Sequence, residues 1–167
     1  MRKLPRSDML REVLLSIFQR KGRVSPNTRP FHEFDEKDQR QVLDGVSLHP
    51  GELPVIAHIL SKWCWTLITT SRIIVQNESE SWEIRNEELL QVKPLNFGAV
   101  QKREMNGLLL TALPDNEERI IHVDRGAPFS GFWNVLQYLA GCSDKELVGE
   151  LGTSSPGVEE QDGDRTA

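Results

Sequence analysis

WCWTLITTSRIIVQ, the stretch from Trp63 to Gln76, carries the strongest strand signal in this chain. Aromatic and β-branched residues fill both of its halves, as in strands that pack on a pleated and largely buried surface. Thr70 and Ser71 lie between the two halves and supply the short polar connection of a β-hairpin. The stretch therefore predicts two antiparallel strands joined by a tight turn.

Further β-like segments surround this hairpin, separated by polar, Gly or Pro residues. The seven predicted strands are Leu53–Leu60, Trp63–Thr69, Arg72–Gln76, Ser81–Arg85, Leu89–Pro94, Gly107–Leu113 and Glu118–Asp124. Connections as short as Ser61–Lys62 cannot contain the crossover that parallel strands need, so we expect an antiparallel meander. Residues 99–106 have no hydrophobic alternation and are predicted as a loop.

Three segments have the apolar spacing or the capping residues of helices. They are Ser7–Gln19, a short polar helix beginning at Asp35 and ending before Gly45, and the aromatic segment Pro128–Gly141. Residues 22–30 contain two prolines and no periodicity, which predicts a linker. The last helix follows all the strands, so we expect it to cover an open end of the sheet structure.

The first helix has an apolar stripe that allows two interpretations. The stripe includes Leu14 and Phe18 and could pack on this protein or on a second copy. Alternatively, the helix is basic enough to lie on a membrane surface, in which case these two side chains would face lipid.

Composition predicts a single globular domain with additional ends. The chain has 167 residues, of which 38% are hydrophobic and 27% charged, and no apolar run approaches the length needed to span a bilayer. We expect a helical arm and linker over residues 1–47, one domain over 48–141 and an acidic, largely disordered tail over 142–167. Two cysteines and no evident signal peptide predict reduced thiols and a cytoplasmic location.

Charge is distributed unevenly along the chain. Residues 1–29 contain eight Lys or Arg and two acidic residues, a net charge of +6, whereas the whole chain carries −5. The remaining residues therefore carry −11, which argues against nucleic-acid binding by the body of the protein.

Several of these segments resemble bacterial pleckstrin-homology-like (PH-like) or GRAM-like domains. The resembling parts are Leu48, the turn Pro50-Gly51-Glu52, the hairpin from Leu67 to Val75, the alternating Ser81–Arg85 and the strand Leu89–Val92. Such domains commonly have a Pro-Gly-Glu entry and a Thr-x-Arg turn at these places. The resemblance extends from about Leu48 to Gly141 and implies a mainly β fold, a seven-stranded antiparallel barrel capped by a C-terminal helix, here with an N-terminal helical extension.

The resemblance does not extend to phosphoinositide binding. Members that bind these lipids cluster Lys and Arg in the loop between the first two strands, where several cations can surround phosphate groups. Here this loop offers only Lys62, and the connection Asn77–Glu80 is acidic. We therefore do not expect the family's usual lipid pocket in this chain.

No motif in the sequence indicates catalysis, a metal or a cofactor. The four histidines, His32, His49, His58 and His122, have no spacing that would place two imidazoles on one metal. A Gly-x-Ser-x-Gly nucleophile elbow and a glycine-rich phosphate loop are both absent from the sequence.

We therefore expect a non-enzymatic PH-like module that binds a protein partner or self-associates, without nucleic acid, metal or cofactor. The alternative is binding to an anionic membrane through the basic N-terminal helix. The candidate partner or lipid contacts are Lys62, Trp63, Arg11, Arg20 and Lys21. Most tryptophans of a domain this size are core residues, and one left exposed beside Lys62 would be a contact residue.

Overall fold

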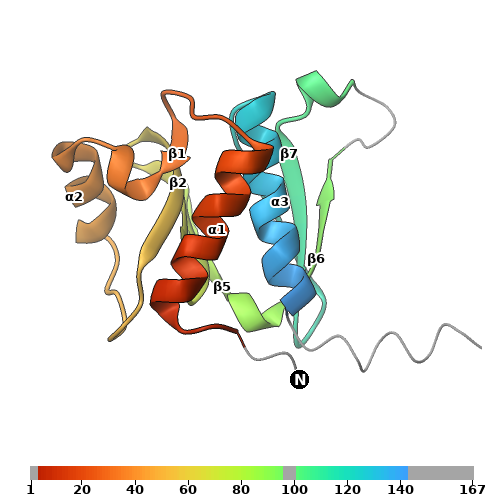
Figure 1. Ribbon diagram of the computed structural model, residues 1–167, viewed down its shortest axis with the longest axis horizontal. Coiled ribbons are helices and arrows are strands. Elements are labelled where there is room, and N and C mark those ends of the chain that lie inside the picture. The colour runs from red at the N-terminus through yellow and green to blue at the C-terminus, as the bar shows by residue number, and fades with distance from the viewer. Residues whose placement is uncertain (1–3, 96–100, 143–167) are drawn as a thin grey trace, which may run out of the picture.

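The computed structural model describes residues 4–95 and 101–142 (Figure 1). Its helices and strands are, in chain order, α1 (Ser7–Lys21), β1 (Thr28–Pro30), α2 (Glu36–Asp44), β2 (Pro54–Ser61), β3 (Cys64–Thr69), β4 (Arg72–Gln76), β5 (Ser81–Arg85), β6 (Leu89–Pro94), β7 (Gly107–Ala112), β8 (Glu117–His122) and α3 (Ala127–Cys142). The seven predicted strands and the three predicted helices are confirmed, with ends that differ by no more than two residues. The predicted tail after Cys142 and residues 99–100 of the predicted loop lie outside the described residues.

The strands form two antiparallel sheets. One sheet has the order β1-β2-β3-β4-β5 and the other the order β6-β7-β8. The sheets meet at a short 3-10 helix, Asn86–Glu88, which connects β5 to β6. The fold is therefore a mixture of helices and antiparallel sheets, and the predicted closed seven-stranded barrel is not confirmed, because the described strands divide into two sheets.

The hairpin predicted from Trp63 to Gln76 is formed by β3 and β4. Ile68 lies opposite Ile73, and Trp65 lies opposite Gln76. The Thr69 hydroxyl accepts hydrogen bonds from the backbone N–H groups of Ser71 at 3.1 Å and Arg72 at 3.0 Å. A side chain thus satisfies the backbone donors of the tight turn, as short polar residues commonly do.

Strand β1 corrects the prediction of a linker over residues 22–30. Thr28 lies opposite His58 of β2, and Pro30 lies opposite Ile56. Three residues are too few for alternation to show, and a proline argues against a central strand. β1 is an edge strand, where the missing N–H of a proline can face away from the sheet.

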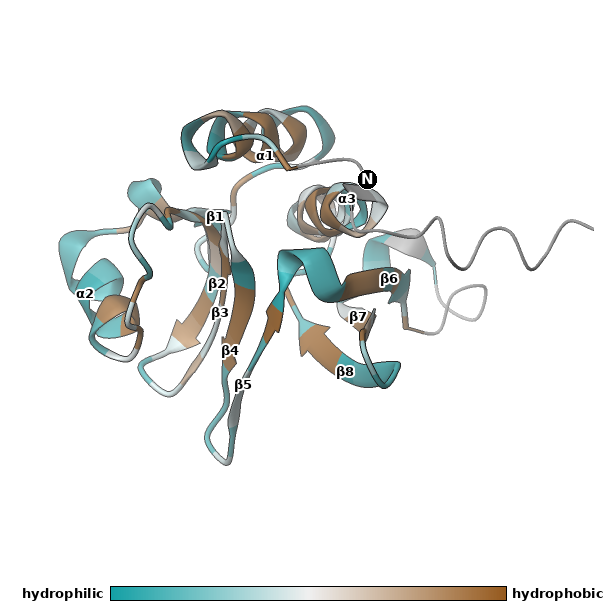
Figure 2. Ribbon diagram, turned by 90° about the horizontal axis from the view of Figure 1, so that it is seen from below, coloured by the Kyte–Doolittle hydropathy of each residue, from teal (hydrophilic) through white to brown (hydrophobic). Residues whose placement is uncertain are grey.

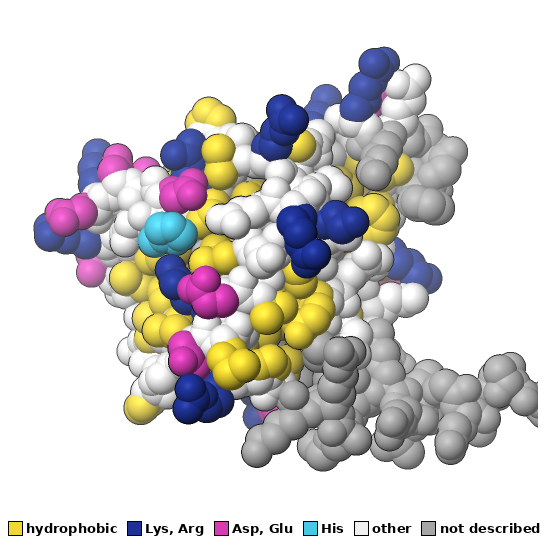
Figure 3. Space-filling view, in the orientation of Figure 1, with side chains coloured by type: hydrophobic (Ala, Val, Ile, Leu, Met, Phe, Trp, Pro, Cys, Tyr) yellow, Lys and Arg dark blue, Asp and Glu magenta, His cyan; other side chains and the backbone are white. Residues whose placement is uncertain are grey.

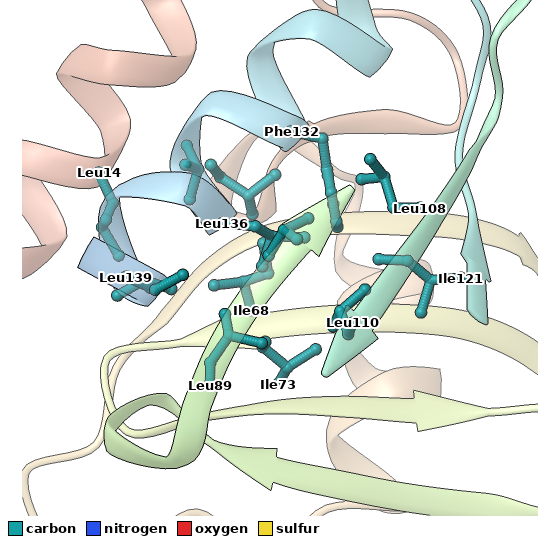
Figure 4. Close-up of a cluster of buried hydrophobic side chains, with 14 of the residues drawn as sticks. Leu14, Ile68, Ile73, Leu89, Leu108, Leu110, Ile121, Phe132, Leu136 and Leu139 are labelled. Atoms are coloured by element: carbon teal, nitrogen blue, oxygen red, sulfur yellow. The ribbon is translucent and has the colours of Figure 1, made fainter. Parts of the chain in front are cut away.

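The larger of two hydrophobic cores lies between the helices and the inner faces of both sheets. Figures 1 and 2 show α1 and α3 side by side over one side of the strands, with α2 set apart from them. Figure 4 shows side chains that meet there. They are Leu14 from α1, Phe132, Leu136 and Leu139 from α3, Ile68 and Ile73 from the five-stranded sheet, and Leu89, Leu108, Leu110 and Ile121 from the three-stranded sheet. The last helix therefore covers the opening between the sheets, as the sequence predicts.

A second core lies on the outer face of the five-stranded sheet. It joins residues from the α2 region to side chains of β2, β3 and β4: Phe31, Phe34, Val42, Ala57, Ile59, Trp65, Leu67 and Ile74. Because side chains alternate along a strand, the sheet contributes one set of residues to each core. The segment around α2 covers only part of this outer face and leaves the portion nearest β5 open to form a cavity.

Helix α1 packs on its own chain. Its buried residues are Leu10, Leu14, Leu15 and Phe18, and Leu14 and Phe18 are 0% and 1% exposed. These two side chains are therefore core residues and do not face lipid in this structure. None of the described helices combines the length and the apolar character needed to cross a bilayer.

Two glycines allow α1 to approach α3 closely. A Cβ atom at Gly131 would lie 2.8 Å from Phe18 Cδ2 and 2.9 Å from Gly22 Cα, which is closer than real Cβ contacts. A Cβ atom at Gly22 would lie 2.6 Å from Gly131 Cα. The end of α1 and the beginning of α3 thus contact each other through backbone, with no room for an added methyl group.

We predict that Gly131→Ala lowers the free energy of unfolding by about 1–3 kcal/mol, because the methyl group overpacks this contact. The matched control is Gly141→Ala in the same helix, since no atom lies within 4 Å of a Cβ at that position. Removing a helical glycine there should leave stability unchanged or raise it by about 0.5–1 kcal/mol. Equal effects of the two variants in urea denaturation would contradict this account of the α1–α3 contact.

Candidate functional site

The first candidate site is a cavity of about 370 Å³ on the outer face of the five-stranded sheet. Its lining comes from β3, β4, β5 and the segment after α2: Gly45, Val46, Ser47, His49, Trp65, Arg72, Ile74, Gln76, Ser81, Trp82 and Glu83. Arg72, Ile74 and Gln76 alternate along β4 and so share one face of the sheet. The cavity is therefore built on rigid strands and closed at one side by the chain that leaves α2.

A buried ion pair forms the base of this cavity. Glu52 follows the turn at Gly51, whose φ of +79° suits glycine, and its side chain is fully buried. Arg72 Nε donates to Glu52 Oε1 at 2.9 Å, and Arg72 Nη2 donates to Glu52 Oε2 at 3.2 Å. The pair is thus bidentate, the geometry in which arginine and carboxylate interact most strongly.

Further hydrogen bonds satisfy the remaining polar groups of this pair. Glu52 also accepts from Thr69 Oγ1 at 2.6 Å and from the backbone N–H of His49 at 2.8 Å. Arg72 donates to Glu83 Oε2 at 2.6 Å and to the Ser47 carbonyl oxygen at 2.7 Å. Two carboxylates therefore share one guanidinium, and the group of three side chains keeps one net negative charge.

The hydrogen bonds of Glu52 determine its ionisation. Burial alone would raise the pKa of Glu52, but the hydrogen bonds from Arg72, Thr69 and the His49 N–H outweigh burial and lower this pKa. The pKa of Arg72 is raised, first by its hydrogen bond to Glu52 and then by Glu83, against the opposing effect of burial. Both partners of the buried pair are therefore charged at neutral pH.

The predicted contacts Lys62 and Trp63 lie together at the turn between β2 and β3. The Trp63 side chain is 59% exposed, and the neighbouring Leu60 is 55% exposed. Lys62 Nζ lies 4.7 Å from the centre of the Trp63 ring, in a cation–π arrangement. Of the other tryptophans, Trp65 is buried and Trp82 and Trp133 are partly buried, so Trp63 is the tryptophan that the fold leaves exposed.

The predicted contacts Arg11, Arg20 and Lys21 lie on α1 and do not join the Lys62–Trp63 turn into one site. Arg11 is half-buried, pairs with Glu12 at 3.3 Å and lies 3.4 Å from His32 Nδ1. It lines a second, smaller cavity of about 280 Å³. Figure 3 shows that the face carrying α1 mixes hydrophobic, basic and acidic side chains. Arg20 and Lys21 are exposed in the last turn of the helix, where cations complement the helix dipole.

A second buried polar cluster joins the segment after α1 to the end of β8. His58 Nδ1 lies 2.7 Å from Thr28 Oγ1, and the Thr28 hydroxyl donates to Asp124 at 3.2 Å. Asp124 also accepts hydrogen bonds from Ser25 and Asn27. Because the Thr28 hydroxyl donates to Asp124, this network fits a neutral His58 whose Nδ1–H donates to Thr28.

Ionisation of this cluster follows from burial and from its charged neighbours. Burial lowers the pKa of His58, nearby Asp124 opposes this effect, and nearby His122 adds to it. Burial would raise the pKa of Asp124, but hydrogen bonds and the neighbouring His58 lower it. The Ser25 and Thr28 hydroxyls donate to the Asp124 carboxylate, whereas the nucleophile of a catalytic triad donates its proton to an imidazole.

Within the described part of the chain, no group of three or more His, Cys, Asp or Glu residues is placed to hold a metal ion. Searches with family models, against curated proteins and against solved structures found no match to this chain.

Sequence reasoning identified the residues of the cavity only in part. It noted Glu52 and Arg72 as fold-determining residues, but it did not pair them or assign Trp65 and Glu83 to a site. The available signal was the Pro-Gly-Glu turn together with the hairpin arginine, since two opposite charges in largely apolar surroundings tend to pair. The cavity itself depends on where α2 lies, and no sequence pattern indicated that position.

We predict that Arg72→Met lowers the free energy of unfolding by about 3–5 kcal/mol, because it leaves the Glu52 carboxylate buried without its cation. The control is Arg85→Met, whose ion pairs with Glu87 and Glu88 are exposed and should contribute no more than about 1 kcal/mol. Adding Glu52→Gln to Arg72→Met should recover part of the loss. Similar free energies of unfolding for Arg72→Met and Arg85→Met would show that the buried Glu52–Arg72 pair stabilises the fold no more than an exposed ion pair does.

We predict that stability falls as the pH is lowered below 6.5, the ordinary pKa of histidine. The pKa of folded His58 is depressed, so the unfolded chain binds more protons than the folded chain in this range. His58→Gln should flatten the dependence between pH 6.5 and about 5, whereas His32→Gln, at an exposed position, should preserve it. Parallel pH profiles of wild type and His58→Gln in urea denaturation would refute this assignment.

Proposed function

We propose that this chain is a non-enzymatic binding module with a PH-like strand order, and that it binds a protein partner. The PH-like part of the proposal is supported by the succession of β2–β5, β6–β8 and a C-terminal helix. It is also supported by the packing of α3 against the inner faces of both groups of strands. The additional elements α1, β1 and α2 surround this unit and enlarge its cores.

The turn between β2 and β3 carries the binding proposal. Leu60 and Trp63 expose more than half of their surface, although large apolar side chains elsewhere in the described chain are mostly buried. Exposed tryptophans are strongly enriched among the residues that dominate binding energy in protein interfaces. Lys62 over the Trp63 ring adds a cation that could approach an acidic group of the partner.

The arrangement of titratable groups supports a non-enzymatic role. In the larger cavity, Glu52, Arg72 and Glu83 satisfy one another. In the cluster at His58, the carboxylate of Asp124 receives the available hydroxyl groups. The Thr28 hydroxyl lies 2.7 Å from His58 Nδ1, but it is fully buried and donates to Asp124, so it is not placed to attack a substrate.

Membrane binding through α1 has less support than protein binding. The apolar side chains that would enter lipid, Leu14 and Phe18, are core residues, and Arg11 pairs with Glu12. An interfacial helix needs a free apolar face as well as basic residues.

We predict that Trp63→Ser removes partner binding without unfolding the protein, because the side chain is 59% exposed. When immobilised, the purified wild-type chain should retain a reproducible set of proteins from a cell extract. If the partner is a second copy, the chain should instead form concentration-dependent oligomers in solution, measured by analytical ultracentrifugation. Either association should be lost in Trp63→Ser and in Leu60→Ser.

The matched control is Ile120→Ser, which changes a 49%-exposed apolar residue on β8 in the other sheet. This variant should retain the association. If Trp63→Ser and Ile120→Ser behave alike, the β2–β3 turn is not the binding surface.

A further inference from the structure

We infer that the outer-face cavity, the cavity of about 370 Å³ bounded by Trp65, Arg72 and Glu83, binds a lysine or arginine side chain of a partner polypeptide. The inference rests on the proposed function in one respect, namely that the partner is a protein. It adds a second site on the module and names the chemistry of the group that enters it.

The cavity lies at the end of the sheet that carries the exposed turn. Trp65, the second residue of β3, lies opposite Gln76, which in turn lies opposite Ser81, and all three line the cavity. Trp63 lies at the turn that immediately precedes β3. A polypeptide that contacts the turn can therefore continue across the outer face of the sheet to the cavity.

The walls of the cavity suit a long side chain with an apolar stem. Trp65 and Ile74 provide apolar surface, and Gln76 and Ser81 provide hydrogen-bonding groups. The Trp82 ring faces the other side of the sheet, because Trp82 lies opposite Val75 and packs against the larger core. Its volume falls in the range of about 300–1,000 Å³ that is usual for ligand pockets. Lysine and arginine bury their methylene stems against apolar surface and keep the charged end near polar groups.

Trp65 is the aromatic side chain of the cavity wall. Ring faces attract cations because the π-electrons make the face negative. At the neighbouring turn, Lys62 Nζ lies 4.7 Å from the centre of the Trp63 ring. The Trp65 ring is thus chemically suited to contact a guanidinium or ammonium group.

The charge of the cavity selects a cation over an anion. Arg72 is the cationic lining residue whose charge two carboxylates, Glu52 and Glu83, share. Glu83 binds Arg72 through Oε2 and its side chain is 50% exposed, so the other oxygen can accept from a ligand.

An anionic group would meet this surplus of carboxylates and find Arg72 already paired. A cationic side chain would pair with Glu83 while its stem contacts Trp65 and Ile74, which is the combination that favours arginine at protein interfaces. The same carboxylates would reject acidic segments and so contribute to specificity.

The test uses the full chain and a hexa-arginine peptide as the probe, with hexa-glutamate as the control peptide. At physiological ionic strength, hexa-arginine should shift the indole N–H resonance of Trp65 in nitrogen–proton NMR spectra. Hexa-glutamate should not shift this resonance. Shifts that spare the Trp65 indole would overturn the assignment of the cavity.

Variants separate binding in the cavity from general attraction to an acidic protein. Glu83→Gln should weaken hexa-arginine binding by about threefold to tenfold, as expected for a partly exposed ion pair. Glu33→Gln makes the same change in net charge at an exposed position outside the lining and should leave binding within about twofold. Equal loss in the two variants would refute the inference.

A third variant tests the inference without removing any existing bond of Arg72. Gln76→Glu adds a carboxylate to the lining and should strengthen hexa-arginine binding by about threefold or more. Unchanged binding in this variant would count against a cationic ligand.

The outcomes also separate this inference from the proposed function. If Trp63→Ser abolishes association but Glu83→Gln and Glu33→Gln are equivalent toward hexa-arginine, the turn is a binding surface and the cavity is not a cation site. If the cavity binds hexa-arginine in a Glu83-dependent way while Trp63→Ser retains association, the cavity inference holds and the role assigned to the turn fails.

Discussion

The bidentate ion pair between Glu52 and Arg72 is the constraint that organises this protein. Glu52 lies just before β2, and Arg72 is the first residue of β4, so the pair fixes the entry to the sheet against the central hairpin. Both side chains are almost entirely buried, and a misplaced strand would leave one charge unpaired at a cost of several kcal/mol. The pair therefore discriminates among registers to an extent that apolar contacts alone, which are non-directional, cannot.

The same pair connects the five-stranded sheet to the chain segment that covers part of its outer side. On the inner side, the strands contribute to the larger core beneath α1 and α3. On the outer side, the α2 segment covers part of the sheet, and Arg72 reaches both the Ser47 carbonyl after α2 and Glu83 on β5. The unit that holds the fold together thus also forms the base of the cavity, so stability and binding at this place depend on the same side chains.

The sequence was sufficient to predict most helices and strands, but it was not sufficient to predict how they pack together. Among the strands of the described residues, alternation and turn residues identified all but β1, because Thr28–Pro30 is too short to alternate and ends in proline. The glycines at positions 22 and 131 gave no signal of their contact, since close backbone approach between distant segments has no local pattern. The predicted N-terminal arm is part of the core in the described structure, because Leu14 and Phe18 of α1 are core residues.

The candidate site residues show the same difference between what neighbouring residues in the sequence indicate and what only tertiary packing determines. Lys62 and Trp63 are adjacent in the sequence, and Lys62 was predicted in the short connection before the strand that begins at Trp63. The sequence did not show which tryptophan would be exposed, and the structure places Trp63 in the turn before β3. Arg11, Arg20 and Lys21 were grouped by charge alone, and the structure places them on a different element from the turn. The cavity brings together residues from Gly45 to Glu83 through tertiary packing, which only the arrangement of α2 on the sheet reveals.

Hydrogen exchange of the Arg72 Nε–H group, measured by NMR, tests the central claim most directly. This proton donates to a fully buried carboxylate at 2.9 Å, and it should exchange as slowly as the backbone amides of β3 and β4, because both require opening of the same sheet. The Nε–H of Arg85, whose side chain is 61% exposed, provides the fast reference. Exchange of Arg72 Nε–H at the rate of Arg85 would contradict the claim that a buried Glu52–Arg72 pair organises this protein.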